Sequence, residues 1–288
     1  MPPSLFLVHG SGIRSKKADL RVTERRGWTM VADLLAGAGL AHLSGASIAF
    51  LAFSATVAGF VRGYSGFGFA LAAMPLMTGV LVPREAIPVV LTFEVLLTLQ
   101  FARTLKGDVA WATLRRLVVG MAAGTPFGVV LLGAIPPEPM RIALCLLLLL
   151  SVGVLWRPPT RSIRASAPLV TGTGVMSGLL SGGTAMSGPP IVLLFLATSD
   201  DAARSRATMM VFFLCSAALA LSLGFGLGVF PVQAPVITTI LVPFVAIGAI
   251  IGARCFAATG KRAYRKVALA ILAVIAVFAL GHSMAIPV

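Results

Sequence analysis

Apolar residues dominate the chain from about residue 46 onward and fall into roughly eight stretches, separated by short polar or basic connections. Six of these have the length of one membrane crossing, because about 20 apolar residues in a helix span the hydrocarbon core. They cover residues 86–102, 114–134, 140–156, 207–230, 234–253 and 267–286. The pattern predicts an all-α fold, a polytopic bundle of transmembrane helices.

The first and fifth stretches, residues 46–83 and 165–199, are too long for one crossing. An unbroken helix of either length would measure more than about 50 Å, against a hydrocarbon core of about 30 Å. Small and helix-breaking residues interrupt both stretches, in the runs AGFVRGYSGFGF and SGLLSGGTAMSGPP. Irregular backbone is tolerated in a membrane only where protein buries it or a watery cavity solvates it. Both breaks therefore predict a binding site, built from re-entrant or paired half-helices.

The two halves of the chain resemble each other, since each has four apolar stretches of which the first is long and broken. Paired glycines also recur at matching places: Gly59 and Gly63 with Gly178 and Gly182, and Gly124 and Gly128 with Gly248 and Gly252. The second set has the spacing of close helix packing. Such self-similarity marks a duplicated unit, which is typical of secondary transporters. We expect an N-terminal tail over residues 1–45, repeats over 46–157 and 165–288, and a cytoplasmic linker over 158–164.

The basic residues predict that the two repeats are inverted. The connection over residues 103–116 is basic, whereas its counterpart in the second half, VFPVQAP, has no charge. The third connections reverse this pattern, because IPPEP has no basic residue and its counterpart over residues 254–266 has several. With basic loops in the cytoplasm, residues 165–199 enter and return from inside, and residues 46–83 from outside. The competing model is eight simple crossings with a tilted first helix.

The first 29 residues do not match the rest of the chain, because they are basic and contain no apolar run long enough for a signal peptide. Codons for residues 24–27 can resemble a ribosome-binding site, and Met30 follows at a suitable spacing. The hypothesis is that residues 1–29 are untranslated, which permits an external N-terminus. The alternative is a disordered basic tail. Tryptic peptides from residues 1–29 in the native host would refute the hypothesis.

Composition agrees with a membrane protein, since 58% of the 288 residues are apolar and 11% are charged. The mean hydropathy of +1.00 lies outside the range of soluble domains. The net charge of +14 lies in the flanks of apolar runs and does not indicate nucleic-acid binding. We predict no cofactor, metal site or disulfide, because the cysteines and histidines are scattered: Cys145, Cys215, Cys255, His9, His42 and His282. The expected partners are the lipid bilayer and a small anion, and the sequence is compatible with a homodimer.

Arg62 in the first break is the only charged residue between Asp33 and Arg84. Placing it in mid-membrane costs at least about 2.5 kcal/mol, so a function should justify it. We interpret it as a cation for an anionic substrate, at the N-terminus of a half-helix. The accompanying candidates are Gly63, Tyr64, Ser65, Gly66 and Gly68. The alternative is a structural ion pair with Glu94, or snorkelling to an interface.

The second break is uncharged and rich in hydroxyl groups and glycine. Pro189 and Pro190 suit the first turn of a new helix, where the missing N–H groups would be unpaired anyway. The amides of Ser187 and Gly188 are then free to face a ligand. The candidates here are Ser181, Gly182, Thr184, Ser187, Gly188 and Pro189. The alternative is a tight hairpin whose small residues serve only packing. Glu94 is a candidate for the proton of a coupled cycle, or it merely neutralises Arg62.

The two broken stretches resemble the paired signatures of the sulfite exporter TauE/SafE family, also called the toluene-sulfonate uptake permease family. The first pattern is met by Gly59, Phe60, Val61, Gly63, Gly66, Phe67, Gly68 and Pro75, and the second by Gly178, Gly182, Gly188, Pro189 and Pro190. The resemblance covers about residues 47–281 and implies a bacterial inner-membrane permease for small anions, with sulfite, sulfoacetate and other organosulfonates among the family's substrates. Arg62 stands where many members have an uncharged polar residue, which signals a different anion or weakens Arg62 as a family-wide ligand.

We therefore predict a permease, not an enzyme, that moves a small anion by alternating access between the two broken helices. An anion channel is an alternative that the sequence leaves open. A rhomboid-like serine protease is a weaker one, based on the GxSG pattern around Ser65 and on His282. Nucleophilic catalysis needs a base within hydrogen-bond reach of the serine, and nearly the whole chain separates these two residues.

Overall fold

The computed structural model describes residues 43–66, 68–102, 109–156, 164–198, 202–259 and 270–275, together with residue 277. The chain divides into two units, Met1–Gly45 and Ala46–Val288. The helices belong to the second unit, apart from Gly45, the first residue of α2. Residues 1–42, and with them the hypothesis of a start at Met30, lie outside the described residues. Only a small part of the predicted last span, residues 267–286, lies within them.

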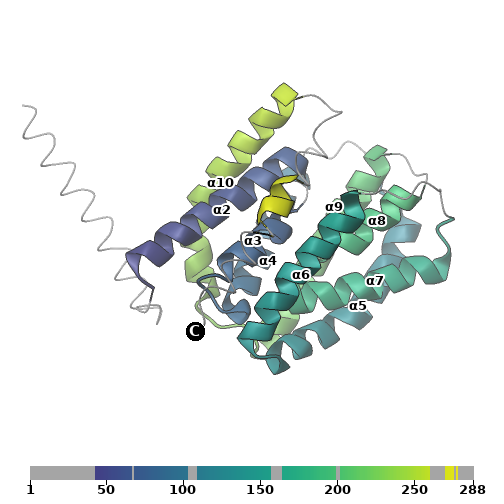
Figure 1. Ribbon diagram of the computed structural model, residues 1–288. Coiled ribbons are helices and arrows are strands. Elements are labelled where there is room, and N and C mark those ends of the chain that lie inside the picture. The colour runs from purple at the N-terminus through teal and green to yellow at the C-terminus, as the bar shows by residue number, and fades with distance from the viewer. Residues whose placement is uncertain are drawn as a thin grey trace, which may run out of the picture. The chain divides into compact units, whose positions relative to one another are not determined.

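Within the described ranges there is no strand, residues 270–275 form a short helical piece, and nine further helices are labelled (Figure 1). They are α2 (Gly45–Ser65), α3 (Phe69–Met77), α4 (Pro83–Ala102), α5 (Trp111–Ala134), α6 (Pro137–Trp156), α7 (Ala167–Thr184), α8 (Gly188–Ala197), α9 (Ala202–Gly226) and α10 (Ala234–Thr259). Five are long and apolar enough to cross a membrane: α2, α5 and α6, with residues 204–226 of α9 and 234–256 of α10. The predicted all-α, multi-pass membrane protein is confirmed for this part of the chain.

Each of the two overlong stretches contains a long helix followed by a short one. In the first stretch α2 ends at Ser65 and α3 begins at Phe69, and in the second α7 ends at Thr184 and α8 begins at Gly188. Left-handed backbone makes both turns, with φ of 76° at Gly66, 85° at Gly68 and 59° at Ala185. Glycine adopts this conformation without a steric penalty, whereas alanine costs about 1–2 kcal/mol there. Both breaks thus fall among the small residues that the sequence singles out.

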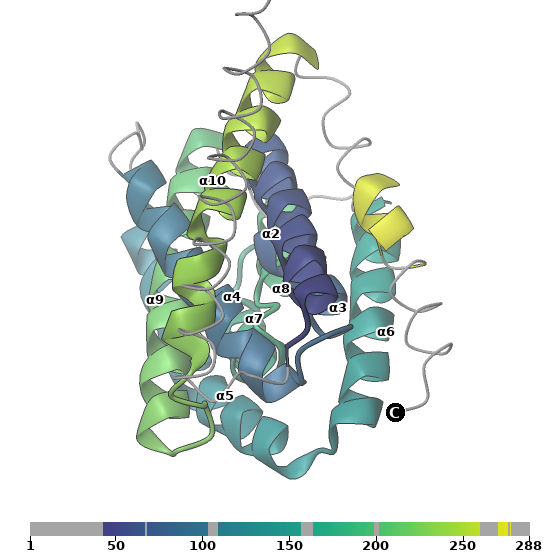
Figure 2. The same ribbon diagram turned by 90° about the vertical axis from the view of Figure 1, so that its left-hand side faces the viewer.

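Two glycines of α2 bring this helix into backbone contact with α10, which runs beside it in both views (Figure 1, Figure 2). A Cβ atom added at Gly59 would clash with the carbonyl of Val245, and one added at Gly63 would clash with that of Ala249. The contact is mutual, because Gly248 and Gly252 of α10 face the carbonyls of Thr56 and Phe60. Any larger residue at these four glycines would separate the two helices.

The same kind of contact joins α7 to α5. Its glycines are Gly174, Gly178 and Gly182 of α7, and Gly120, Gly124 and Gly128 of α5. At each of them an added Cβ atom would clash with a backbone carbonyl of the other helix. The glycines of α5 and α10 therefore serve the close packing that their spacing predicts. The broken stretch of one half packs on the third long helix of the other half, so the halves are intertwined.

Two polar contacts show which helix ends lie together. The amide of Ala110, just before α5, donates to Thr208 Oγ1 in the first turns of α9 at 2.9 Å. Nε of Arg84, at the start of α4, donates to the carbonyl of Val229 beyond the end of α9 at 3.3 Å. Since α4 packs on α9, the two helices are antiparallel. An apolar core that includes Leu117, Ile191 and Phe212 joins α5, α8 and α9.

Candidate functional site

A pocket lies between the two breaks and takes the same number of lining residues from each half of the chain. The first half contributes Arg62, Gly68, Ala70, Leu71 and Glu94, and the second half contributes Ala185, Met186, Ser187, Gly188 and Phe213. The empty space among them, with the part that is open to the outside, is about 310 Å³. The two predicted breaks are therefore brought together at one pocket.

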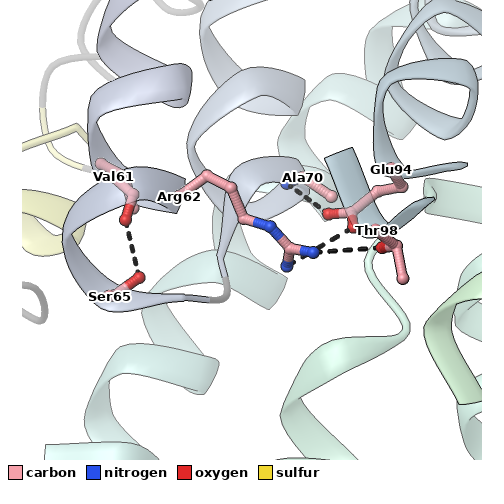
Figure 3. Close-up of polar contacts among 6 residues, drawn as sticks. All are labelled: Val61, Arg62, Ser65, Ala70, Glu94 and Thr98. Carbon is pink, nitrogen blue, oxygen red and sulfur yellow. Dashed lines mark hydrogen bonds and ion pairs between the residues drawn. The ribbon is translucent and has the colours of Figure 1, made fainter. Parts of the chain in front are cut away.

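Arg62 lies in the last turn of α2, and its side chain is only 1% exposed. Its Nη1 lies 3.7 Å from Glu94 Oε2, and its Nη2 donates to Thr98 Oγ1 at 3.1 Å (Figure 3). Its Nε has no hydrogen-bond partner among the described residues. A buried donor without a partner costs free energy, more so when the group is charged. The guanidinium group therefore keeps at least one unused donor, and Arg62 is among the residues that line the pocket.

Glu94 connects the arginine to the beginning of α3. Its Oε1 accepts from the amide of Ala70, in the first turn of α3, at 3.4 Å (Figure 3). A carboxylate is stabilised at a helix N-terminus, where unpaired amides and the helix dipole leave a partial positive charge. The ion pair that the sequence offered as the structural alternative is thus present, and both partners line the pocket.

The N-termini of the two short helices meet the same pocket. Gly68 precedes α3 and Ser187 precedes α8, and neither helix has a side-chain cap. Pro189 and Pro190 in the first turn of α8 have no amide hydrogen. Helix N-termini without caps bind anions through their free amides and the helix dipole. At α3 this place is already held by the carboxylate of Glu94, whereas no side chain caps α8.

A family model described as sulfite exporter TauE/SafE matches residues 51–279. The chain belongs to the TauE/SafE family. This is a family of membrane transporters of the sulfite and sulfonate type, and it implies a small anionic substrate. The predicted family and the predicted transmembrane permease are thereby confirmed. Comparisons with curated proteins and with solved structures give no match.

Of the site residues predicted for this TauE/SafE chain, Arg62, Gly68, Ser187 and Gly188 line the pocket, as does Glu94. The other predicted residues lie in or beside the breaks without lining it. Gly63 and Gly182 lie at the crossings of α2 with α10 and of α7 with α5. Pro189 is a buried residue of the first turn of α8.

Among the hydroxyl-bearing candidates, Tyr64 makes ring contacts and its buried hydroxyl has no hydrogen-bond partner within the described residues, whereas the serine and threonine candidates described next form hydrogen bonds. Tyr64 stacks on Phe60 and meets Phe256 edge-on, towards α10. The hydroxyl groups of Ser65 and Thr184 donate to backbone carbonyls four residues earlier, at 2.7 Å each. Ser181 accepts from Ser216 of α9 at 2.8 Å. Of the two residues that suggested a protease, Ser65 is bonded to its own helix and His282 lies outside the described residues.

Several pocket residues escaped the sequence analysis. Phe213 and Ala185 could have been found from the repeat, because counting from Gly59 and Gly178 pairs Glu94 with Phe213 and Gly66 with Ala185. Ala70, Leu71 and Met186 carry no sequence signal beyond their nearness to the breaks.

Arg206 is an exposed residue in the first turns of α9. Its guanidinium group lies beside Gly66, where an added Cβ atom would be 2.8 Å from Nη2. This is the C-terminal end of α2, whose partial negative charge attracts a cation.

Among the described residues, no group of three or more His, Cys, Asp or Glu side chains could hold a metal ion.

Proposed function

We propose that this TauE/SafE chain moves a small anion, such as sulfite, an organosulfonate or a related organic acid, across the bacterial inner membrane by alternating access at the pocket between the breaks. One observation carries the proposal. The N-termini of two short helices and a buried arginine converge on a single pocket. Partial positive charge from both helices and the charge of Arg62 act on the same small volume, and the carboxylate of Glu94 offsets part of this charge.

The depth of the pocket supports this function. Glu94 and Phe213 lie at the same place when they are counted from the first residues of α4 and α9, and both are near the middle of their helices. Residues 204–226 of α9 are long and apolar enough to cross a membrane, so the middle of α9 is expected near the bilayer midplane. Glu94 lines the same pocket as Phe213 and is expected at a similar depth. Substrate sites of secondary transporters built from repeats lie at that depth.

An inverted duplication with repeats over residues 46–157 and 165–288 fits the helix ends. The starts of α5 and α9 lie together, as do the start of α4 and the end of α9. Basic residues flank the first group, which the positive-inside rule assigns to the cytoplasm. In this arrangement α2 and α3 enter and return from the outside, and α7 and α8 from the cytoplasm.

The glycine contacts suggest which parts move. They join α2 to α10 and α5 to α7 at backbone distance, so each pair is expected to move as one body. Each pair includes the long helix that leads to one of the breaks. A small rotation of one pair against the other would therefore open the pocket to one side while the other side closes.

Counterflow in proteoliposomes tests the proposal with wild type, Arg62→Gln and Arg115→Gln. The control arginine is exposed on α5 and does not line the pocket. Losing a hydrogen bond to a charged group costs about 1.5–3 kcal/mol, which lowers exchange of methanesulfonate or sulfite by about ten- to a hundredfold in Arg62→Gln. Arg115→Gln should behave as wild type. Unsaturable, conductive flux would indicate a channel. Equal exchange rates for Arg62→Gln and Arg115→Gln would show that Arg62 does not contribute to anion binding.

A further inference from the structure

We infer that Glu94 is a resident anion of the pocket and makes it select monovalent over divalent anions. The inference rests on the proposed function, because it concerns the charge that the same pocket can accept. It is carried by the placement of one carboxylate between Arg62 and the N-terminus of α3.

The two charged side chains of the pocket cancel before any substrate binds, and the remaining positive charge comes from the helix ends. Arg62 and Glu94 are the charged side chains that line it within the described part of the chain, and they form an ion pair. The two helix N-termini add partial positive charge of roughly half a unit each. Glu94 already accepts from the first turn of α3, which leaves the N-terminus of α8 and Nε of Arg62 for a ligand.

A monovalent anion would therefore neutralise the remaining positive charge of the pocket, whereas a divalent anion would leave the pocket with a net negative charge. The second negative charge would lie in the same pocket as the Glu94 carboxylate, where the low dielectric strengthens repulsion. Glu94 Oε1 accepts from the amide of Ala70 at 3.4 Å, and Oε2 lies 3.7 Å from Arg62 Nη1 without a hydrogen bond, so the ion pair and one hydrogen bond keep the carboxylate on this side of the pocket. The ligand head is thus expected on the opposite side, at Ser187 and Gly188 of the second break.

The second half of the chain shows that this carboxylate is no requirement of the fold. Phe213 of α9 takes the place that Glu94 takes in α4, and α9 forms a long helix and lines the pocket without a charge. The counterpart of Arg62 in the second half is Ser181, which is uncharged, so neither member of the ion pair is needed to make the turn. The carboxylate thus belongs to the charge of the pocket, which is the property that the inference concerns.

The test compares methanesulfonate with sulfate, two tetrahedral anions of similar size that carry one and two charges at pH 7. Their affinities for the purified protein are measured by calorimetry in detergent, with wild type, Glu94→Gln and Thr98→Val. Wild type should bind methanesulfonate more tightly. Glu94→Gln keeps the shape and loses the charge, so its affinity for sulfate relative to methanesulfonate should rise by about tenfold or more. Thr98→Val also removes a partner of Arg62 but keeps the carboxylate, so it should weaken both anions by similar factors.

Two results would overturn the inference. One is a wild type that binds sulfate as tightly as methanesulfonate, and the other is a folded Glu94→Gln variant with an unchanged ratio of affinities. If Glu94→Gln fails to fold, Glu94→Asp replaces it, since it keeps the charge and should keep the preference for the monovalent anion. A Glu94→Asp variant without that preference would contradict the inference. Failure of the proposed function gives a different result in the same binding experiment. In that case Arg62→Gln would bind methanesulfonate and sulfate with the affinities of wild type.

Discussion

The two broken stretches share one backbone design. In the first, the amide of Gly66 donates to the carbonyl of Arg62 at 2.8 Å, and in the second the amide of Ala185 donates to that of Ser181 at 3.0 Å. Gly66 and Ala185 both have left-handed backbone, and a short helix begins a few residues later in each stretch. The same turn is thus made twice, with different side chains.

The side chains around the two turns differ in charge. Arg62 contacts Glu94 and Thr98, whereas its counterpart Ser181 contacts only another hydroxyl group, that of Ser216, among the contacts described. Because the uncharged stretch breaks in the same way, the ion pair is not what breaks the helix. Helix-terminating small residues and glycine crossings are sufficient for that. The charge of the first stretch is an addition, and it lies at the pocket.

The largest expected effect concerns the helix crossings, which should be equally sensitive in the two halves. Gly63→Ala and its counterpart Gly182→Ala each place a Cβ atom against a backbone carbonyl of the neighbouring helix, and backbone yields less readily than the end of a flexible side chain. We expect each to lower the free energy of unfolding by about 1–3 kcal/mol, as overpacking does. Thermal unfolding in detergent measures it.

Gly153→Ala is the matched control for both variants, because no atom lies within 4 Å of a Cβ added there. It should be neutral or slightly stabilising, since alanine favours a helix over glycine. If only one of the two crossing variants lost stability, the halves would not be held together in the same way.

The two matching left-handed residues, Gly66 and Ala185, should change stability with opposite signs when they are substituted. Gly66→Ala puts a side chain at φ 76° and is expected to cost about 1–2 kcal/mol. Ala185→Gly removes that strain but gives the unfolded chain more freedom, so it should gain less than about 1 kcal/mol. Ala112→Gly on the exposed face of α5 is the control and should lose about 1 kcal/mol. A loss of stability in Ala185→Gly would show that the second turn is not strained.

Ser216→Ala tests the neutral contact of the second stretch. It removes the buried hydrogen bond to Ser181, and the expected loss of unfolding free energy is about 0.5–1.5 kcal/mol. The control is Ser222→Ala, whose exposed hydroxyl bonds only to its own helix and should change stability very little. Anion affinity should stay near that of wild type in both, because neither serine lines the pocket. A tenfold fall in anion affinity for Ser216→Ala would show that the hydrogen bond between Ser216 and Ser181 also contributes to anion binding.

The smallest effect is expected at Arg206, the cation at the end of α2. Arg206→Gln should lower stability by about 0.3–1 kcal/mol, and salt should weaken the difference. Arg116→Gln in the first turns of α5 is the control and should cost nothing, since a cation near a helix N-terminus is not stabilising. Equal melting temperatures for Arg206→Gln and wild type at low salt would contradict a role at this helix end.

Much of the fold and part of the site follow from local sequence. The two overlong stretches predict a pair of breaks, and Gly-Pro-Pro predicts that a new helix begins there, as α8 does at Gly188. Arg62, Gly68, Ser187 and Gly188 were predicted and line the pocket, because a charge and bare amides at a helix break are visible in the sequence itself. Phe213 and Met186 were missed because apolar residues at a site look like any other apolar residues.

The sequence by itself determined that this TauE/SafE chain is a helical membrane protein, where its helices break and which break carries the charge, since these depend on the hydropathy and the backbone preferences of neighbouring residues. Only the tertiary structure decided that α2 packs on α10 and α5 on α7, that both breaks meet at one pocket, and that Glu94 lies between Arg62 and α3. Paired glycines show that a helix can be approached closely, but they do not say by which partner. That choice depends on shape and packing across the whole bundle.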